Sequence, residues 1–150
     1  MPGFYSSIEI SASGLSAERL AMDVIANNIA NANTTRTPEG GPFKRQLILF
    51  AQKQDPTAAQ PGDDMPGGGQ SAGLAGVQVV GILNDPGPDR LVYDPTHPDA
   101  DANGYVHYPN VEIIKEMVDM IAASRAYEAN VAAIQDARQM GQAALSLLQA

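Results

Sequence analysis

The sequence predicts a mainly α fold: long N- and C-terminal helices paired as a coiled coil, with a Pro/Gly-rich middle segment forming a small β-hairpin or extended element. Apolar residues recur every seven positions near both ends, which is typical of coiled-coil helices. Every proline except Pro2 lies in the middle segment, so continuous helix is excluded there. We therefore expect a terminal-helix coiled-coil domain from residues 1–33 and 110–150. Residues 34–109 should form an extended or β segment.

The first helix is expected between Phe4 and about Asn33, a stretch without proline. At a rise of about 1.5 Å per residue, it would be roughly 40 Å long. A seven-residue repeat favours left-handed supercoiling against another helix. The apolar positions of this repeat are Ile8, Leu15, Met22 and Ile29.

The second helix is expected to begin after Pro109, with Asn110 as its N-cap, and to continue nearly to the last residue. Early Glu112 and Glu116 and late Arg138 suit the helix dipole. Its length would be roughly 60 Å. One row of the repeat is Ile113, Met120, Tyr127, Ile134, Gly141 and Leu148, and the interleaved row is Met117, Ser124, Val131, Arg138 and Leu145.

The middle segment divides into three parts. Residues 43–50 are predicted to form a short strand, and the Pro- and Gly-rich residues 55–73 a flexible loop. Residues 76–82 and 90–93 alternate well enough to be strands, with 84–89 as the turn between them. A small hairpin made of these two strands is the expected β structure.

The charge and composition exclude several classes of protein. A formal net charge of -8 and a pI near 4.5 argue against nucleic acid or an anionic membrane as a partner, because both would repel the chain. No run of about 18 apolar residues is present, so we expect no direct membrane insertion. The absence of cysteine excludes thiolate chemistry. The first 13 residues lack Lys and Arg, so we expect export, if any, without a cleaved Sec signal.

An acidic stretch in the middle segment is the sharpest candidate for a metal site. It fits the first half of an EF-hand calcium loop, but position twelve, which should be Glu, is Asn110. We therefore favour a solvated, turn-forming loop over a calcium-binding or hydrolytic protein that uses these carboxylates. The residues of the motif are Asp99, Asp101, Asn103 and Gly104.

No other residues indicate chemistry. His97 and His107 lie between prolines rather than on a regular element, and we expect them to be exposed loop residues rather than metal ligands. The serines lack the GxSxG context of a nucleophile, and no Gly-rich phosphate loop is present. We expect no enzymatic activity, no cofactor and no metal.

Further apolar positions on both helices indicate oligomerisation. Two paired helices can bury one face each, so a second stripe of small residues would suit the close approach of further helices. A monomeric helical hairpin with an Ala-rich outer surface is the alternative. The second stripes are Ala17, Leu20, Ala21 and Val24 on the first helix, and Ala122, Ala126, Ala129, Ala133 and Ala137 on the last.

Four asparagines near the end of the first helix are unusual for a helix interior. Two roles are open: capping of the helix end, or hydrogen bonds from one helix face to a neighbouring segment. We expect Asn33 to lie near a C-cap and Asn27 and Asn31 to lie on one face. The fourth is Asn28.

Three segments of the chain resemble the flagellar axial-protein family. NNIANANTTRTP (27–38) is similar to the family's signature in its first helix, and ASRAYEANVAA (123–133) to its C-terminal signature. YDPTHPDADANGYVHYPNV (93–111), followed by EMVDMIAASRAYEAN, is similar to rod proteins of the FlgC type. The resemblance covers nearly the whole chain, and residues 55–73 match it least.

The resemblance implies a structural subunit of the proximal rod of the bacterial flagellar basal body, which crosses the periplasmic space. It implies export through the type III apparatus, self-assembly into a helical tube that transmits torque for motility, and contact with other rod proteins and the basal-body base. A secreted coiled-coil module outside the flagellum is the alternative from the repeats alone. Together the repeats and the resemblance predict an assembly interface at Leu15, Met22, Asn27, Asn28, Ile29, Asn31, Met117, Met120, Arg125, Tyr127, Asn130, Val131 and Ile134.

Overall fold

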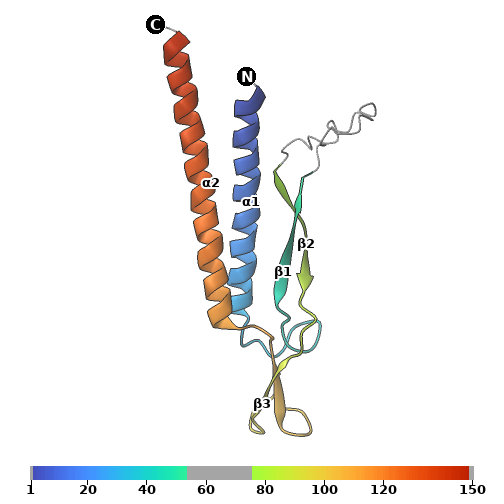
Figure 1. Cartoon of the computed structure of the whole chain (residues 1–150). Coiled ribbons are helices and arrows are strands. Elements are labelled where there is room, and N and C mark those ends of the chain that lie inside the picture. Colours follow the sequence, from blue (N-terminus) through green and yellow to red (C-terminus); the bar gives the residue numbers. More distant parts are fainter. Residues whose placement is uncertain (1, 54–75, 149–150) are drawn as a thin grey trace, which may run out of the picture. The chain divides into compact units, whose positions relative to one another are not determined.

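The structure, a computed structural model, describes residues 2–53 and 76–148 (Figure 1). Long helices stand at the two ends of the chain and four strands lie between them in sequence. The prediction of helical ends with β structure between them is confirmed, whereas the predicted loop at 55–73 lies outside the described residues. The elements are α1 (Pro2–Ala30), β1 (Gln46–Gln52), β2 (Val77–Asn84), β3 (Arg90–Tyr93), β4 (Tyr105–Tyr108) and α2 (Ile113–Leu148).

The chain folds as two compact units, and each contains part of both helices and part of the β structure. The first unit consists of Met1–Glu18, Phe50–Val80 and Arg125–Ala150. The second consists of Arg19–Leu49 and Gly81–Ser124. Every contact described below lies within one of these units.

The first pair of strands is β1 with β2. In the first unit the amide of Lys53 donates to the carbonyl of Gly76 at 2.9 Å, and in the second the amide of Asp85 donates to the carbonyl of Arg45 at 2.7 Å. Residues beyond the end of β1 therefore meet residues before the start of β2, which is an antiparallel arrangement.

The second pair is β3 with β4, antiparallel, with Arg90 opposite Tyr108 and Tyr93 opposite Tyr105. The predicted hairpin between residues 76–82 and 90–93 is therefore wrong. The segment between β2 and β3 contains two prolines, and each strand takes another partner. β3 instead pairs with β4, a strand inside the stretch predicted to be only a loop.

The helix ends also differ from the predictions. α1 already includes Pro2 at its first position, where proline's fixed φ suits a helix and its missing N–H costs nothing. α2 begins at Ile113, and the amide of Glu116 donates to the carbonyl of Glu112 at 3.0 Å. Asn110 is therefore not the N-cap, because it lies too far before the first turn.

The buried face of α1 is not the predicted row of large apolar residues. The most buried apolar side chains are Ala17, Ala21 and Val24, which recur at helical spacing and were expected to face outward. The predicted row from Ile8 to Ile29 is only half-buried. Small side chains therefore occupy the closest contacts of this helix, and the larger ones lie at the edges.

On α2 the predicted second row is displaced by one residue. Glu116, Ala123 and Ala137 are buried, seven or fourteen residues apart, whereas Met117 and Leu145 are 54% and 61% exposed. Met120, Tyr127 and Ile134, from the first predicted row, are half-buried. They lie at the edge of the buried face. The error has a simple origin: the chain buries a carboxylate at Glu116, and apolar periodicity cannot predict this.

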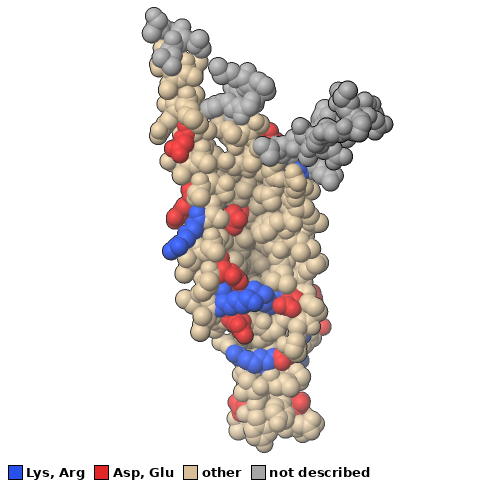
Figure 2. Space-filling view, viewed as in Figure 1, with Lys and Arg blue, Asp and Glu red and all other residues tan. Residues whose placement is uncertain are grey.

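The charged side chains on the face shown in Figure 2 lie mostly in mixed groups of both signs, surrounded by a larger uncharged surface. In residues 2–53 and 76–148, neither helix contains a stretch that is both long and apolar enough to span a bilayer.

Candidate functional site

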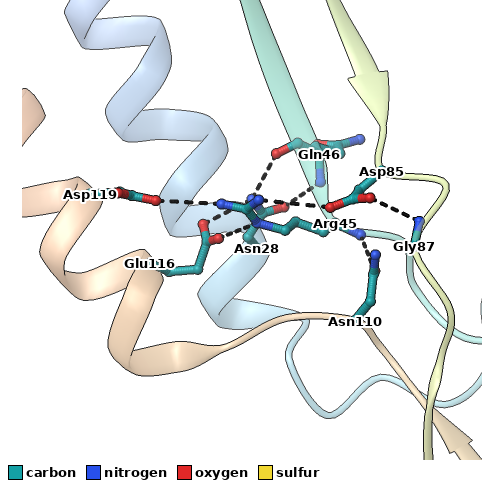
Figure 3. Close-up of polar contacts among 8 residues, drawn as sticks. All are labelled: Asn28, Arg45, Gln46, Asp85, Gly87, Asn110, Glu116 and Asp119. Carbon is teal, nitrogen blue, oxygen red and sulfur yellow. Dashed lines mark hydrogen bonds and ion pairs between the residues drawn. The ribbon is translucent and has the colours of Figure 1, made fainter.

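A buried polar cluster in the second unit joins α1, the start of β1 and the first turns of α2 (Figure 3). Its members come from segments far apart in sequence: Asn28 from α1, Arg45 and Gln46 at the start of β1, and Glu116 from α2. Asn28 and Glu116 are each only 1% exposed. Such groups are stable inside a protein only when their hydrogen-bonding capacity is filled.

The amide of Asn28 pairs with the backbone of Gln46 as a neighbouring strand would. Its Oδ1 accepts from the Gln46 amide at 2.8 Å, and its Nδ2 donates to the Gln46 carbonyl at 2.9 Å. The same Nδ2 donates to Oε2 of Glu116 at 3.0 Å. One helix side chain therefore ties the first residue of β1 to both helices.

Arg45 provides the positive charge of the cluster. Its Nε donates to Oε1 of Glu116 at 2.5 Å, so both oxygens of this carboxylate have partners. Its Nη2 lies 3.4 Å from Asp119, and its Nη1 lies 3.8 Å from Asp85. Removing one partner of such a pair lowers stability more than replacing both partners by apolar residues, because the remaining buried charge is left uncompensated.

The backbone around Arg45 is held as well. Its amide donates to Oδ1 of Asn110 at 3.0 Å, which is the role that this asparagine has instead of capping α2. Oδ1 of Asp85 accepts from the amide of Gly87 at 2.8 Å, and a Cβ on Gly87 would lie 3.1 Å from that oxygen. The segment after β2 is thus fastened to the same cluster.

Asn27 and Asn31 are hydrogen-bonded as well. Nδ2 of Asn31 donates to both the carbonyl and Oδ1 of Asn27, each at 3.0 Å. Nδ2 of Asn27 donates to Oε1 of Gln46 at 3.0 Å. Asn27 is therefore bonded from α1 to a neighbouring segment, one of the two roles left open by the sequence, whereas Asn31, one residue past the end of α1, bonds back to Asn27.

The first unit contains a tight joint at Ser13 and Gly14 of α1. Oγ of Ser13 accepts from the amide of Val77 at 3.1 Å, and a Cβ on Gly76 would lie 2.3 Å from that oxygen. A Cβ on Gly14 would lie 3.0 Å from the side-chain amide of Asn130 in α2. Two consecutive small residues therefore admit β2 and α2 to close contact with the same helix.

The acidic stretch forms turns that end in β4. Oδ1 of Asp101 accepts from the amides of Asn103 and Tyr105 at 2.8 and 2.9 Å, and these hydrogen bonds, the one from Tyr105 first, lower the pKa of Asp101. Hydrogen bonds from Thr96 lower the pKa of Asp94 in the same way. Oδ2 of Asp99 accepts from Thr35 at 2.8 Å. These carboxylates thus act as turn-forming groups.

The two histidines lie in different places: His97 is in the turns before β4, and His107 is on β4 itself. Nδ1 of His97 accepts from the amide of Asp99 at 3.1 Å, and His107 lies 3.6 Å from Asp89. Among the described residues, no group of three or more His, Cys, Asp or Glu side chains is placed to hold a metal ion.

The residues predicted for the assembly interface occupy several environments. Asn28 is enclosed in the polar cluster, and Asn27 and Asn31 are bonded as above. The exposed residues are Asn27, Met117 and Arg125. Half-buried positions are Leu15, Met22, Ile29, Met120, Tyr127, Asn130, Val131 and Ile134.

Three residues that are important in the structure were not predicted from the sequence. Ser13 is one serine among several, and only its closeness to Gly76 distinguishes it. Arg45 was expected only as part of the short strand at 43–50, and Glu116 only to favour the helix dipole. A charged residue at an inward position of a heptad row is the signal that could have revealed Glu116, because such a position requires a buried partner.

Comparisons with known proteins agree with this architecture. Residues 8–36 match the family described as "Flagella basal body rod protein", and residues 102–147 match "Flagellar basal body rod FlgEFG protein C-terminal". A flagellar basal-body rod protein FlgC of Borreliella burgdorferi is 47% identical over 98% of this chain and 99% of its own length. FlgC proteins of Bacillus subtilis and Salmonella typhimurium are 40% and 36% identical, over 95% and 88% of this chain and 97% and 88% of their own lengths. The chain therefore belongs to the FlgC family of flagellar basal-body rod proteins.

Proposed function

We propose that this chain is a structural subunit of the proximal rod of the flagellar basal body, which polymerises into a helical tube and transmits torque for motility. The observation that carries the proposal is the match to the FlgC protein of Borreliella burgdorferi, which extends over 98% of this chain. Basal-body rod proteins are part of the flagellar basal body, and the matched families are rod-protein rather than enzyme families.

The form of the chain supports assembly. α1 and α2 contain 29 and 36 residues, a large share of a chain of 150. Large apolar side chains, among them Ile114, Val118 and Met140, remain exposed. Contact with neighbouring subunits would remove this apolar surface from water.

The finer parts of the proposal concern how the chain reaches and enters the rod. We infer that the terminal helices pair as a coiled coil in an axial core domain, and that the chain is exported by the flagellar type III apparatus. Its partners are other copies of itself, other rod proteins and the basal-body base. The half-buried residues Leu15, Met22 and Ile134 are the interface positions on which the proposal depends most.

A deletion strain tests the proposed function. Deleting the gene should remove the external flagellum and motility, and re-expression should restore both. Substituting Leu15→Asp or Ile134→Asp should abolish motility while the protein is still exported, because a charge at a half-buried helix position prevents close packing. Ser16→Asp, at the exposed neighbouring position, is the matched control and should stay motile. Intact filaments in the deletion strain would overturn the proposal.

A further inference from the structure

One side of the β3–β4 ribbon carries apolar and aromatic side chains that face solvent. In an antiparallel pair, residues opposite each other share a face, and successive residues alternate. The register therefore places Leu91, Tyr93, Tyr105 and His107 together on one side, which we term the ribbon face. All four side chains are exposed, and Tyr93 is 65% exposed.

The opposite side of the ribbon anchors it to the second unit. Val106 is completely buried there, and the guanidinium of Arg90 lies 5.2 Å from the centre of the Tyr108 ring. The ribbon thus has one side packed against its own unit and one apolar side in water. An apolar surface of this kind on a protein that functions in an assembly indicates an interaction site.

The ribbon face is ordered before any partner arrives. The rings of Tyr93 and Tyr105 meet edge to face with centroids 5.3 Å apart. A Cβ on Gly104 would lie 3.0 Å from the Tyr93 ring, so the ring lies directly over the glycine backbone. Aromatic side chains fixed in this way lose little rotamer freedom on binding, which is typical of residues that dominate interface energies.

The rim of the ribbon face is acidic. Asp94 and Asp101 lie at its tip, next to Tyr93 and Tyr105, and both carboxylates carry a negative charge at neutral pH, as aspartates ordinarily do. Asp89 lies at the other end, 3.6 Å from His107. Asp89 is already paired with Lys44, so a partner that covers this face must bring positive charge to the tip, beside Asp94 and Asp101.

A second copy of the chain is poorly suited to that role. It would bring the same net charge of -8, and three of its nine Lys and Arg side chains, Lys44, Arg45 and Lys53, already pair with acidic groups of their own chain. We propose that the ribbon face, Leu91, Tyr93, Tyr105 and His107, is a docking site for a basic, apolar segment of a different protein. The inference rests on the proposed function, because the partner is sought in the basal body.

Site-specific photocrosslinking tests the proposal directly. The photoreactive residue p-benzoylphenylalanine replaces Tyr93, flagellated cells are irradiated, and basal bodies are isolated. We expect one main adduct, in which mass spectrometry finds Lys or Arg beside apolar residues of another polypeptide. The same residue in place of Val92, on the other side of the ribbon, is the matched control and should not give this adduct.

A second experiment tests the role of the acidic rim. The Asp94→Asn and Asp101→Asn substitutions together keep an acceptor oxygen for each turn but remove both charges, and they should lower the adduct yield about threefold. An adduct to a second copy of the chain, an unchanged yield, or no adduct would each overturn the inference. Recovery of the unsubstituted protein in basal bodies is scored separately, because its absence there would contradict the proposed function instead. Tyr105 offers a second attachment point if the Tyr93 variant is not incorporated.

Discussion

Asn28 makes three hydrogen bonds while its side chain is 1% exposed, and only a primary amide of this length can make them. It must donate twice, to Gln46 and Glu116, and accept once, from Gln46. An aspartate at position 28 could not donate to Gln46 or Glu116, and an alanine would remove all three hydrogen bonds. The sequence indicated that the asparagine cluster was unusual, but it could not single out Asn28, because the partners lie 18 and 88 residues away.

Substitution at Asn28 should therefore be graded by chemistry. Asn28→Ala should lower the free energy of unfolding by about 1–3 kcal/mol, because buried groups lose their partners. Asn28→Asp should cost more, about 3–5 kcal/mol, because it sets a second carboxylate beside Glu116. Urea denaturation of the purified variants measures both. Adding Glu116→Gln to Asn28→Asp should recover part of the loss, and a loss no greater than that of Asn28→Ala would contradict this account.

The contact between Gly76 and Ser13 makes a second prediction. Gly76→Ala places a Cβ 2.3 Å from Oγ of Ser13 at a φ of 88°. Gly40 has nearly the same φ, 90°, but nothing within 4 Å of its added Cβ. Gly40→Ala should cost only the backbone strain, about 1–2 kcal/mol, whereas Gly76→Ala should cost more. Thermal unfolding followed by circular dichroism would show equal melting temperatures if the clash were unimportant.

The two helices of the first unit meet where Gly14 faces Asn130. Gly14→Ala alone should be neutral or destabilising, because the new Cβ would lie 3.0 Å from an amide that is already bonded to the carbonyl of Ala126. In an Asn130→Ala background the same change should stabilise by about 1 kcal/mol, the usual gain for Ala over Gly in a helix. A double-mutant cycle measures the reversal of sign. Additive effects would show that the two residues do not contact each other.

The turn before β4 should respond to acid. The pKa of Asp101 lies below its ordinary value of 3.8, so its ionised form stabilises the folded turn. That contribution is complete above about pH 4 and is lost as the pH falls through the lowered folded-state pKa. The amide proton shift of Tyr105, measured by NMR, should titrate with a midpoint below 3.8. Asp101→Asn should abolish the titration, and a midpoint above 3.8 would contradict the assignment.

Elements were easier to predict than the contacts between them. The seven-residue spacing of Ile113, Met120 and Tyr127 was enough to identify α2, because local periodicity determines a helix face. The buried second row was displaced because Glu116 is satisfied by Arg45, 71 residues away. For a related reason, β3 was predicted to pair with β2, and β4 was not predicted as a strand. Strand pairing depends on contacts and turn geometry that a short alternating pattern does not contain.

The chain as a whole has a core of small residues. Its buried apolar residues are mainly alanines and valines, and Leu, Ile and Phe are not among them in the described part of the chain. Burial of an alanine removes much less apolar surface from water than burial of a leucine, so the stability gained by the isolated chain is modest. Much larger apolar groups remain available for contacts between subunits.

The terminal helices of the isolated chain should therefore be frayed. In a dilute monomer, amides near both ends should exchange quickly with solvent, and those around Asn28 and Glu116 more slowly. Hydrogen exchange and circular dichroism measure this, and assembly should raise both protection and helicity. Complete protection of both helices in the monomer would contradict the prediction.

The pairing of Asn28 with the backbone of Gln46 has one more consequence. A strand that slips by one residue along its partner turns every side chain to the opposite side of the sheet. The side chain of Asn28 bonds both the amide and the carbonyl of Gln46, the first residue of β1, so a slipped strand would lose both hydrogen bonds at once. Asn28 thus favours a single register for β1, although it lies on a helix and not on a strand of the sheet.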